Sequence, residues 1–170
     1  MPRVSIAVAT PSDAPSLAAL HALVADDLTA RHGRGPWSFT TSERVVLQTI
    51  ESARVLVARQ RQRVVGTLTL ATRKPWAIDP TYFTAVPRPL YLTSMAVLPA
   101  YQRRGVGGRL LEAAREAAIA WPADAIRLDA YDAAAGAGPF YARCGYAERG
   151  RAVYRGTPHV YFELCLRPEP

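Results

Sequence analysis

The stretch AYQRRGVGGRL, residues 100–110, constrains the fold most, because it joins two segments of different periodicity through glycine and arginine. The uncharged run LYLTSMAV, residues 90–97, precedes it and predicts a buried β-strand. Apolar residues then recur at helical spacing from Leu110 until Pro122 ends the pattern. The chain therefore contains a strand, a glycine-rich turn and a helix in direct succession.

A glycine-rich turn at the start of a helix predicts an anion site, because free backbone N–H groups and the helix dipole both favour negative charge there. Arg103, Arg104 and Arg109 can add charge-assisted contacts to phosphate oxygens. The P-loop pattern is absent, since no lysine follows these glycines, and the dinucleotide pattern fails because its third glycine falls at Leu110. A plain tight turn with a solvated run of charges is the alternative interpretation.

The remaining patterns predict one α/β sheet domain with the order β-α-α-β-β-β-α-β-α-β-β. The alternation at Val4–Val8 indicates a strand, and Ser12 or Asp13 can cap the helix that follows. A second helix with a cap at residues 40–42 and a hairpin turning at residues 60–62 come next. Strands and helices are then expected in the segments IRLDAY, GPFYARCG, AERGRAVY and HVYFELCL.

Residues 72–89 form a long connection with four prolines and the aromatic residues Trp76, Tyr82 and Phe83. A connection of this length inside a compact domain is usually functional or disordered. The aromatic residues favour an ordered lid.

The composition favours an anionic ligand without naming it. Lys and Arg number 21 against 14 Asp and Glu, a formal net charge of +7. This balance suits a polyanionic small molecule, nucleic acid or an anionic surface. Cys144 and Cys165 are too few for a disulfide framework, and no cluster of ligands predicts a metal site. No segment has the length of a membrane span, so a cytoplasmic protein is expected.

The segment YLTSMAVLPAYQRRGVGGRLL resembles the cofactor signature of the GNAT superfamily of N-acetyltransferases, with Gln102, Gly105 and Gly107 at its defining positions. The segments IRLDAY and FYARCGY are similar to the next strand and helix end of that family. The resemblance implies a single domain over residues 1–170. It also implies a mixed, mostly antiparallel sheet of six to seven strands, with helices on both faces and a splayed parallel strand pair at the centre.

Acetyl-CoA is the cofactor that the resemblance implies, bound in the gap between residues 90–97 and 126–131. Backbone groups of Met95, Ala96 and Val97 would pair with the pantetheine arm. The pyrophosphate would lie against the amides of the loop, whose implied binding residues are Gln102, Arg103, Arg104, Gly105, Val106, Gly107, Gly108 and Arg109.

Tyr141 matches the tyrosine that is the usual general acid of the family, where a phenol protonates the departing thiolate. A buried structural aromatic is the alternative for this residue. Ala134 departs from the family, because relatives often have a cofactor-binding asparagine there, and Asp132 is not equivalent. Tyr91 and Thr93 occupy positions where some members of the family have a general base, and neither side chain is a strong base. Deprotonation of the acceptor amine by water, relayed through Tyr91, Thr93 or Ser94, is therefore considered.

The resemblance places the acceptor beside residues 31–39, 72–89 and 154–160. Candidate acceptor-side residues there and on the central strand are Trp37, Trp76, Asp79, Tyr82, Tyr91, Thr93 and His159. The arginines of these segments favour a small amine that also bears a carboxylate or phosphate, with solvated loop arginines as the alternative.

Three alternative functions stay open. A non-catalytic CoA-binding or regulatory module on the same fold is one, and acetylation of a protein N-terminus or lysine is another. A nucleic-acid binder is the third; it is not expected, because no basic-aromatic recognition module is present. A homodimer is also considered, since many relatives dimerise.

Overall fold

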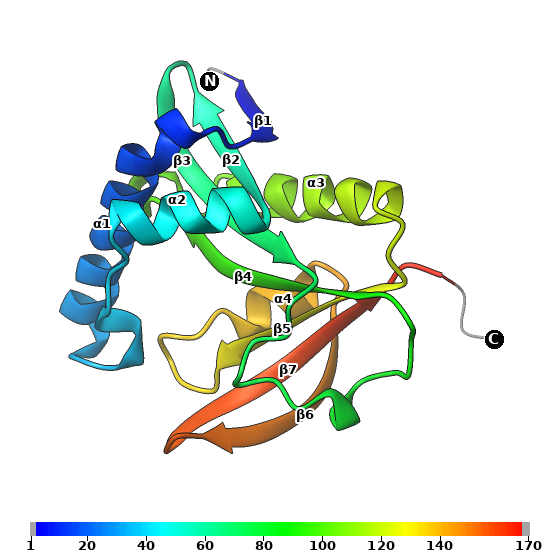
Figure 1. Cartoon of the computed structure of the whole chain (residues 1–170). Coiled ribbons are helices and arrows are strands. Elements are labelled where there is room, and N and C mark those ends of the chain that lie inside the picture. Colours follow the sequence, from blue (N-terminus) through cyan, green and yellow to red (C-terminus); the bar gives the residue numbers. More distant parts are fainter. Residues whose placement is uncertain (1–2, 168–170) are drawn as a thin grey trace. The chain divides into compact units, whose positions relative to one another are not determined.

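The computed structural model describes residues 3–167 and contains the predicted order of helices and strands (Figure 1). The α-helices are α1 Ala14–His32, α2 Glu43–Ser52, α3 Val106–Ala120 and α4 Gly138–Arg143. The strands are β1 Val4–Val8, β2 Arg54–Gln60, β3 Arg63–Ala71, β4 Pro89–Val97, β5 Ala125–Tyr131, β6 Ala147–Tyr154 and β7 Thr157–Cys165. Short 3-10 turns are η1 Pro11–Asp13, η2 Pro36–Ser38, η3 Pro80–Tyr82 and η4 Pro99–Tyr101.

The seven strands follow the order β1-β2-β3-β4-β5-β7-β6, which confirms the predicted mixed sheet. The pairs β1–β2, β2–β3, β5–β7 and β7–β6 are antiparallel, whereas β4 and β5 run parallel. Parallel neighbours need a long crossover, and α3 supplies it between these two strands.

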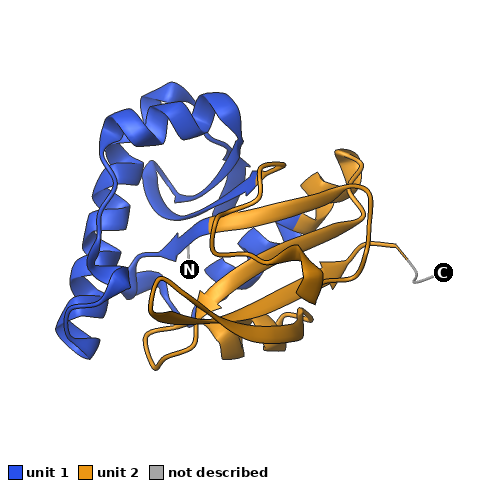
Figure 2. Ribbon diagram, turned by 60° about the horizontal axis from the view of Figure 1, so that its bottom comes forward, with its two compact units in different colours: residues 1–70, 94–114 blue, residues 71–93, 115–170 orange. Residues whose placement is uncertain are grey.

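The chain divides into two compact units, which Figure 2 shows in different colours. Unit 1 holds residues 1–70 and 94–114, and unit 2 holds residues 71–93 and 115–170. The boundary between them crosses β4 and α3, so each unit contains part of both elements.

In unit 1, the start of α1 differs from the predicted cap. Asp13 occupies the N-cap position, but its carboxylate makes no cap hydrogen bond to α1. It accepts the Thr10 N–H at 2.8 Å instead and pairs with the Arg59 guanidinium on β2. Asp13 therefore joins the η1 turn to β2. The predicted cap of α2 is confirmed, since Ser42 Oγ accepts from the Val45 N–H at 3.3 Å.

Close packing between β3 and α3 in unit 1 depends on Gly66. A Cβ at this position would lie 3.0 Å from Leu110 and 3.2 Å from Val106. Both of those side chains are buried and stand one turn apart at the start of α3. The missing side chain lets the glycine-rich end of α3 approach the sheet.

In unit 2, alternate residues of β7 serve opposite faces of the sheet. Phe162 packs against Tyr141 of α4, with 6.0 Å between ring centroids. Tyr161 belongs to the other face, where it forms a buried cluster with Ile78, Phe83 and Tyr91. The 72–89 connection supplies two of these residues, so it is ordered as predicted and covers this face.

Candidate functional site

The loop from Gln102 to Gly105 turns sharply before α3 begins. Gly105 has a φ of +81°, a left-handed conformation that favours glycine. Apart from its neighbours in the chain, no atom lies within 4 Å of where its Cβ would stand. The position of a Cβ on Gly108 is equally open. The first helical hydrogen bond runs from the Arg109 N–H to the Gly105 carbonyl at 3.1 Å, so the N–H groups of residues 106–108 precede it. Open space beside such donors fits a phosphate group.

The side chains of this loop divide into buried and exposed groups. Val106 is buried, whereas Arg103, Arg104 and Arg109 are exposed. Gln102 is half-buried, and its Nε2 donates to the Val97 carbonyl at 3.0 Å. We interpret Gln102 as closing the turn between β4 and α3, while the three arginines remain available to an anion.

The parallel pairing of β4 and β5 is short. It joins residues 89–91 to residues 125–127, while β4 continues to Val97 and β5 to Tyr131. Ser94 interrupts the extended course of β4 with a φ of +53°, which is uncommon for a residue with a side chain. Met95, Ala96 and Val97, the residues expected to pair with pantetheine, directly follow this distortion.

Tyr141 is buried on α4, with 6% of its surface exposed. Its ring packs against Phe162 and against Tyr146, at 6.0 and 5.9 Å between centroids. Burial raises the pKa of Tyr141, and the negative charge of Asp129 raises it further. The hydroxyl therefore keeps its proton at neutral pH, which is the state that a proton donor needs.

Buried polar groups of unit 2 hold the 72–89 connection at two places. The Tyr161 hydroxyl donates to the Ala77 carbonyl and accepts the Asp79 N–H at 3.3 Å. Farther along the connection, the Thr84 N–H donates to Glu163 Oε1 at 3.2 Å, and Arg127 donates to the Thr84 carbonyl. Strands β5 and β7 thus fix both parts of the connection.

Arg127 and Glu163 form a buried ion pair that the sequence patterns did not predict. Arg127 Nε lies 2.9 Å from Glu163 Oε2, and the two side chains are 5% and 0% exposed. Arg149 adds a second cation at 3.1 Å. Burial by itself raises the pKa of Glu163, but the hydrogen bonds from Arg127 and Thr84 outweigh it, so the net pKa is lowered and the carboxylate stays charged.

His159 forms a second carboxylate pair on the same face. Its Nδ1 lies 2.7 Å from Asp129 Oδ2, with 8% of the His159 side chain and 19% of the Asp129 side chain exposed. The ring of Tyr131 lies 5.5 Å from the imidazole and that of Tyr154 lies 6.4 Å away. His159, one of the acceptor-side candidates, therefore lies between a carboxylate and two aromatic rings.

The acceptor-side candidates of unit 2 are brought together in part. Asp79, Tyr82 and Tyr91 all lie around Tyr161, since Tyr82 stacks on it edge-on at 5.3 Å and Tyr91 shares its buried cluster. The Tyr91 hydroxyl lies 3.4 Å from Arg127 Nη1, so it belongs to the ion-pair network.

The other candidates have surroundings of their own. Trp76 is 78% exposed, and Thr93 is half-buried on β4. Trp37 lies in unit 1, where its Nε1–H donates to the Gly33 carbonyl at 2.9 Å. Their acceptor-side roles stay predictions.

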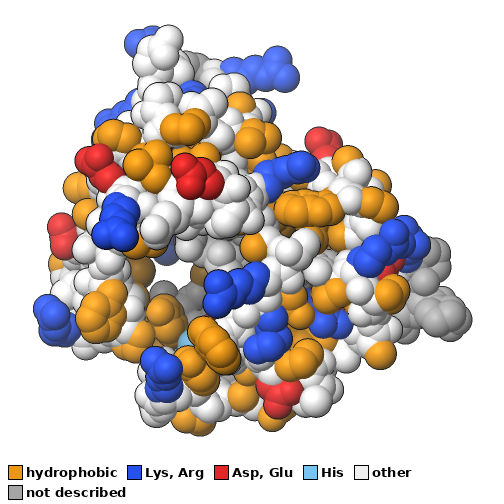
Figure 3. Space-filling model, in the orientation of Figure 1, with side chains coloured by type: hydrophobic (Ala, Val, Ile, Leu, Met, Phe, Trp, Pro, Cys, Tyr) orange, Lys and Arg blue, Asp and Glu red, His pale blue; other side chains and the backbone are white. Residues whose placement is uncertain are grey.

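Several cations of the expected acceptor segments already have partners. Arg31 pairs with Asp27 at 2.7 Å, and Arg88 pairs with Asp124 at 3.4 Å. The Lys74 ammonium donates to two backbone carbonyls of its own connection. Arg155 lies over the Tyr154 ring at 5.3 Å. The face seen in Figure 3 carries more Lys and Arg side chains than Asp and Glu, dispersed among apolar ones.

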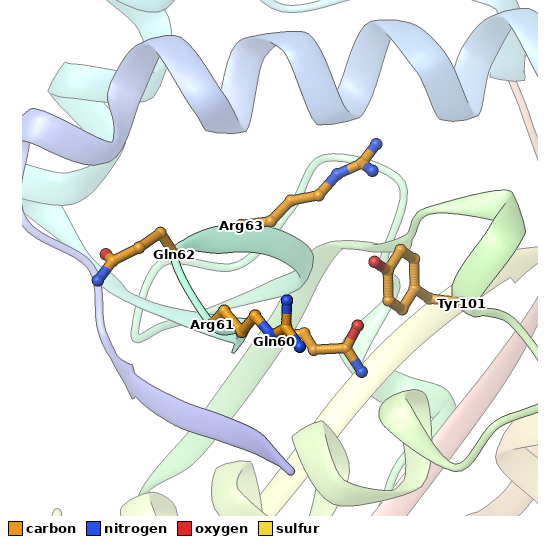
Figure 4. Close-up of a pocket in the computed structure, with 5 residues that line it drawn as sticks. All are labelled: Gln60, Arg61, Gln62, Arg63 and Tyr101. Carbon is orange, nitrogen blue, oxygen red and sulfur yellow. The ribbon is translucent and has the colours of Figure 1, made fainter. Parts of the chain in front are cut away.

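A pocket of about 570 Å³ lies at the β2–β3 turn of unit 1 (Figure 4). Gln60, Arg61, Gln62, Arg63 and Tyr101 line it. The Arg63 guanidinium lies 5.8 Å from the centroid of the Tyr101 ring. Of these lining residues, Tyr101 directly precedes the glycine loop in the chain. The sequence patterns did not indicate this basic, aromatic surface.

The features of the site indicate a class of enzyme. Unit 1 offers helix N–H groups that precede the first helical hydrogen bond beside glycines. Unit 2 holds a parallel strand pair that ends early and a buried, protonated tyrosine. Each of these features fits an enzyme that uses an acyl-CoA thioester. The profile of the acetyltransferase (GNAT) domain matches residues 51–148, and the chain belongs to this family. It is an N-acetyltransferase whose acyl donor is acetyl-CoA.

Solved structures of low sequence identity share the fold. The Salmonella typhimurium protein yncA, solved with its cofactor acetyl-CoA, is 18% identical with a TM-score of 0.70, covering 98% of this chain and 95% of its own. The ribosomal-protein-S18-alanine N-acetyltransferase of Escherichia coli is 18% identical with a TM-score of 0.70, covering 99% and 97%. The ribosomal-protein-alanine N-acetyltransferase of Brucella melitensis is 21% identical with a TM-score of 0.72, covering 95% and 99%.

A search of curated protein sequences gives no match. Within residues 3–167, no helix has both the length and the apolar character needed to cross a membrane.

Proposed function

We propose that the protein transfers the acetyl group of acetyl-CoA directly to the primary amine of a small molecule within a ternary complex. Acetyl-CoA supplies the activated acetyl group. The N–H groups of residues 106–108 and the loop arginines would bind its pyrophosphate, and the backbone of Met95–Val97 would bind its pantetheine arm. These roles follow the open space at Gly105 and Gly108 and the early end of the β4–β5 pairing.

Tyr141 is the proposed general acid. Its burial and the nearby Asp129 charge keep the phenol protonated, so the hydroxyl can donate a proton to a departing thiolate. Tyr141 belongs to the same unit as the short β4–β5 pairing.

The anchored 72–89 connection is the observation that carries the small-molecule proposal. It is tied to β7 through Tyr161 and Glu163 and covers the face that holds the candidates Tyr91 and His159. A covered face suits a compact amine better than an extended polypeptide. Arg155, stacked on Tyr154 beside His159, supports an acceptor that also bears a carboxylate or phosphate.

Acetylation of a protein N-terminus is the second candidate. Two structural neighbours are named for acting on alanine of ribosomal proteins, although their identities of 18% and 21% extend to fold alone. Free thiol released from acetyl-CoA tests both candidates, with tyramine, 4-aminobutyrate, phosphoethanolamine and a peptide with N-terminal alanine as acceptors. Turnover of the small amines supports the proposal, and turnover of the peptide alone favours the second candidate. Binding of CoA without turnover of any acceptor favours a non-catalytic module.

A further inference from the structure

The proposed reaction needs a general base, because a free alkylamine is largely an ammonium at neutral pH. The roles assigned above do not include one. A lysine-type amine has a pKa of about 10.4. Attack on the thioester requires its nitrogen lone pair, so one proton must leave first. Neither Tyr91 nor Thr93 is a base of suitable strength, and Tyr91 is bound to the buried Arg127.

We propose that His159, oriented by Asp129, is the general base that deprotonates the acceptor amine. This inference rests on the proposed function, since it concerns the same reaction. The two residues stand 30 positions apart and meet because β5 and β7 are antiparallel, with Tyr131 opposite His159 and Asp129 opposite Tyr161. Their 2.7 Å contact resembles the base–carboxylate pairs that act in other enzymes.

The carboxylate selects the useful tautomer of the imidazole. With Asp129 at Nδ1, the favoured neutral form carries its proton on Nδ1 and leaves the lone pair on Nε2. Within the described part of the chain, Nε2 has no hydrogen-bond partner, and it is not among the fully buried polar atoms that lack one. Nε2 is therefore the imidazole nitrogen that the proposal assigns to the acceptor amine.

A carboxylate and two aromatic rings surround the imidazole. Asp129 can pair with an imidazolium that forms during proton transfer, and the ring centroids of Tyr131 and Tyr154 lie 5.5 and 6.4 Å from that of the imidazole. Asp79 lies on the same side, with its pKa lowered by hydrogen bonds from Thr81, so it is ionised at neutral pH. The titratable or charged groups facing this region from β5, β6, the β6–β7 turn and the 72–89 connection are Asp129, Tyr131, Asp132, Arg151, Tyr154, Arg155, Tyr161 and Asp79.

The proton balance is simple. One N–H bond of the ammonium breaks, its electron pair stays on nitrogen and the proton binds Nε2. The imidazolium, paired with Asp129, then returns that proton to solvent. After attack on the thioester the nitrogen loses a second proton, and the departing thiolate takes one proton from Tyr141. The second nitrogen proton restores Tyr141 through solvent, so the products are the amide, the thiol and one released proton. Asp129 also contributes to the raised pKa of Tyr141, so the carboxylate that orients the base helps to keep the acid protonated.

The test compares wild type with His159→Gln and Asp129→Asn, using tyramine, 4-aminobutyrate and phosphoethanolamine as acceptors. For each amine that wild type acetylates, we expect kcat/KM of His159→Gln to fall about 100-fold or more at pH 7. The deficit should shrink as the pH rises toward the pKa of the amine, because the variant can use only the neutral fraction. Asp129→Asn should show a smaller loss with the same pH trend. His21→Gln, a histidine change on α1, is the matched control.

The outcomes are separable. If wild type acetylates no primary amine, the proposed function fails and this inference fails with it. If wild type does so and His159→Gln keeps the wild-type pH profile, His159 is not the base and the function stands. A deficit that is constant with pH and accompanied by a lower melting temperature assigns the pair a structural role. If His159→Gln does not fold, the pH profile of Asp129→Asn decides in the same way.

Discussion

Replacing Glu163 with glutamine tests how far the buried ion pair stabilises unit 2. The substitution preserves size and an amide oxygen for the Thr84 N–H, but it removes the charge that faces Arg127 at 2.9 Å and Arg149 at 3.1 Å. Breaking a buried pair costs about 3–5 kcal/mol because the remaining charge is left uncompensated. Arg127 keeps its bonds to Thr84 and Tyr91, so we expect the low end, about 3 kcal/mol.

Urea and thermal unfolding followed by tryptophan fluorescence and circular dichroism measure this loss. For a chain of this length, a loss of 3 kcal/mol corresponds to a fall in Tm of about 6–12 °C. The control is Glu148→Gln, since Glu148 pairs with Arg151 at 2.9 Å but its side chain is 45% exposed. An exposed pair contributes at most about 1 kcal/mol.

The pH dependence gives an independent check of sign. The pKa of Glu163 is lowered in the folded protein. Its stabilisation is therefore fully present above the ordinary glutamate value of 4.5 and is lost as the pH falls through the lower folded value. The stability difference between wild type and Glu163→Gln should therefore shrink below pH 4.5. A variant within about 1 kcal/mol of wild type at pH 7, or a difference that does not shrink on acidification, would refute the reasoning.

Three further predictions concern the cofactor site and the acid. Gly105→Glu or Gly107→Glu should abolish binding of CoA. In wild type, CoA at 100 times its Kd should raise the free energy of unfolding by about 2.7 kcal/mol, and absence of the corresponding rise in Tm contradicts the proposed cofactor site. Higher salt should weaken the binding of CoA more than the binding of a phosphate-free pantetheine analogue, because the loop arginines act through phosphate. Equal salt dependence of the two affinities, measured by calorimetry, would contradict that role of the arginines. Tyr141→Phe should lower kcat about 100-fold and change the acetyl-CoA Kd less than about threefold, and single-turnover transfer at the wild-type rate would exclude Tyr141 as the acid.

Local sequence patterns determined the order of elements and the cofactor loop. Helical and strand periodicities, the Ser42 cap and Pro122 act over a few residues, so they could be read directly from the chain. The requirement for glycine at position 105 is also local, because it follows from one positive φ before a helix. The prediction that the Asp13 side chain caps α1 was wrong, because a contact between distant residues competes with the local one. The Asp13 carboxylate pairs with Arg59, a residue 46 positions away.

Tertiary structure alone decided the polar networks beside the proposed acceptor site. Arg127 meets Glu163, and Asp129 meets His159, because β5 and β7 pair in one particular antiparallel register. Side chains alternate between the two faces of a strand, so a shift of the pairing by one residue would send these partners to opposite faces. No local pattern in either strand specifies that register. It follows from how both faces are buried at once, by α4 on one side and the 72–89 connection on the other.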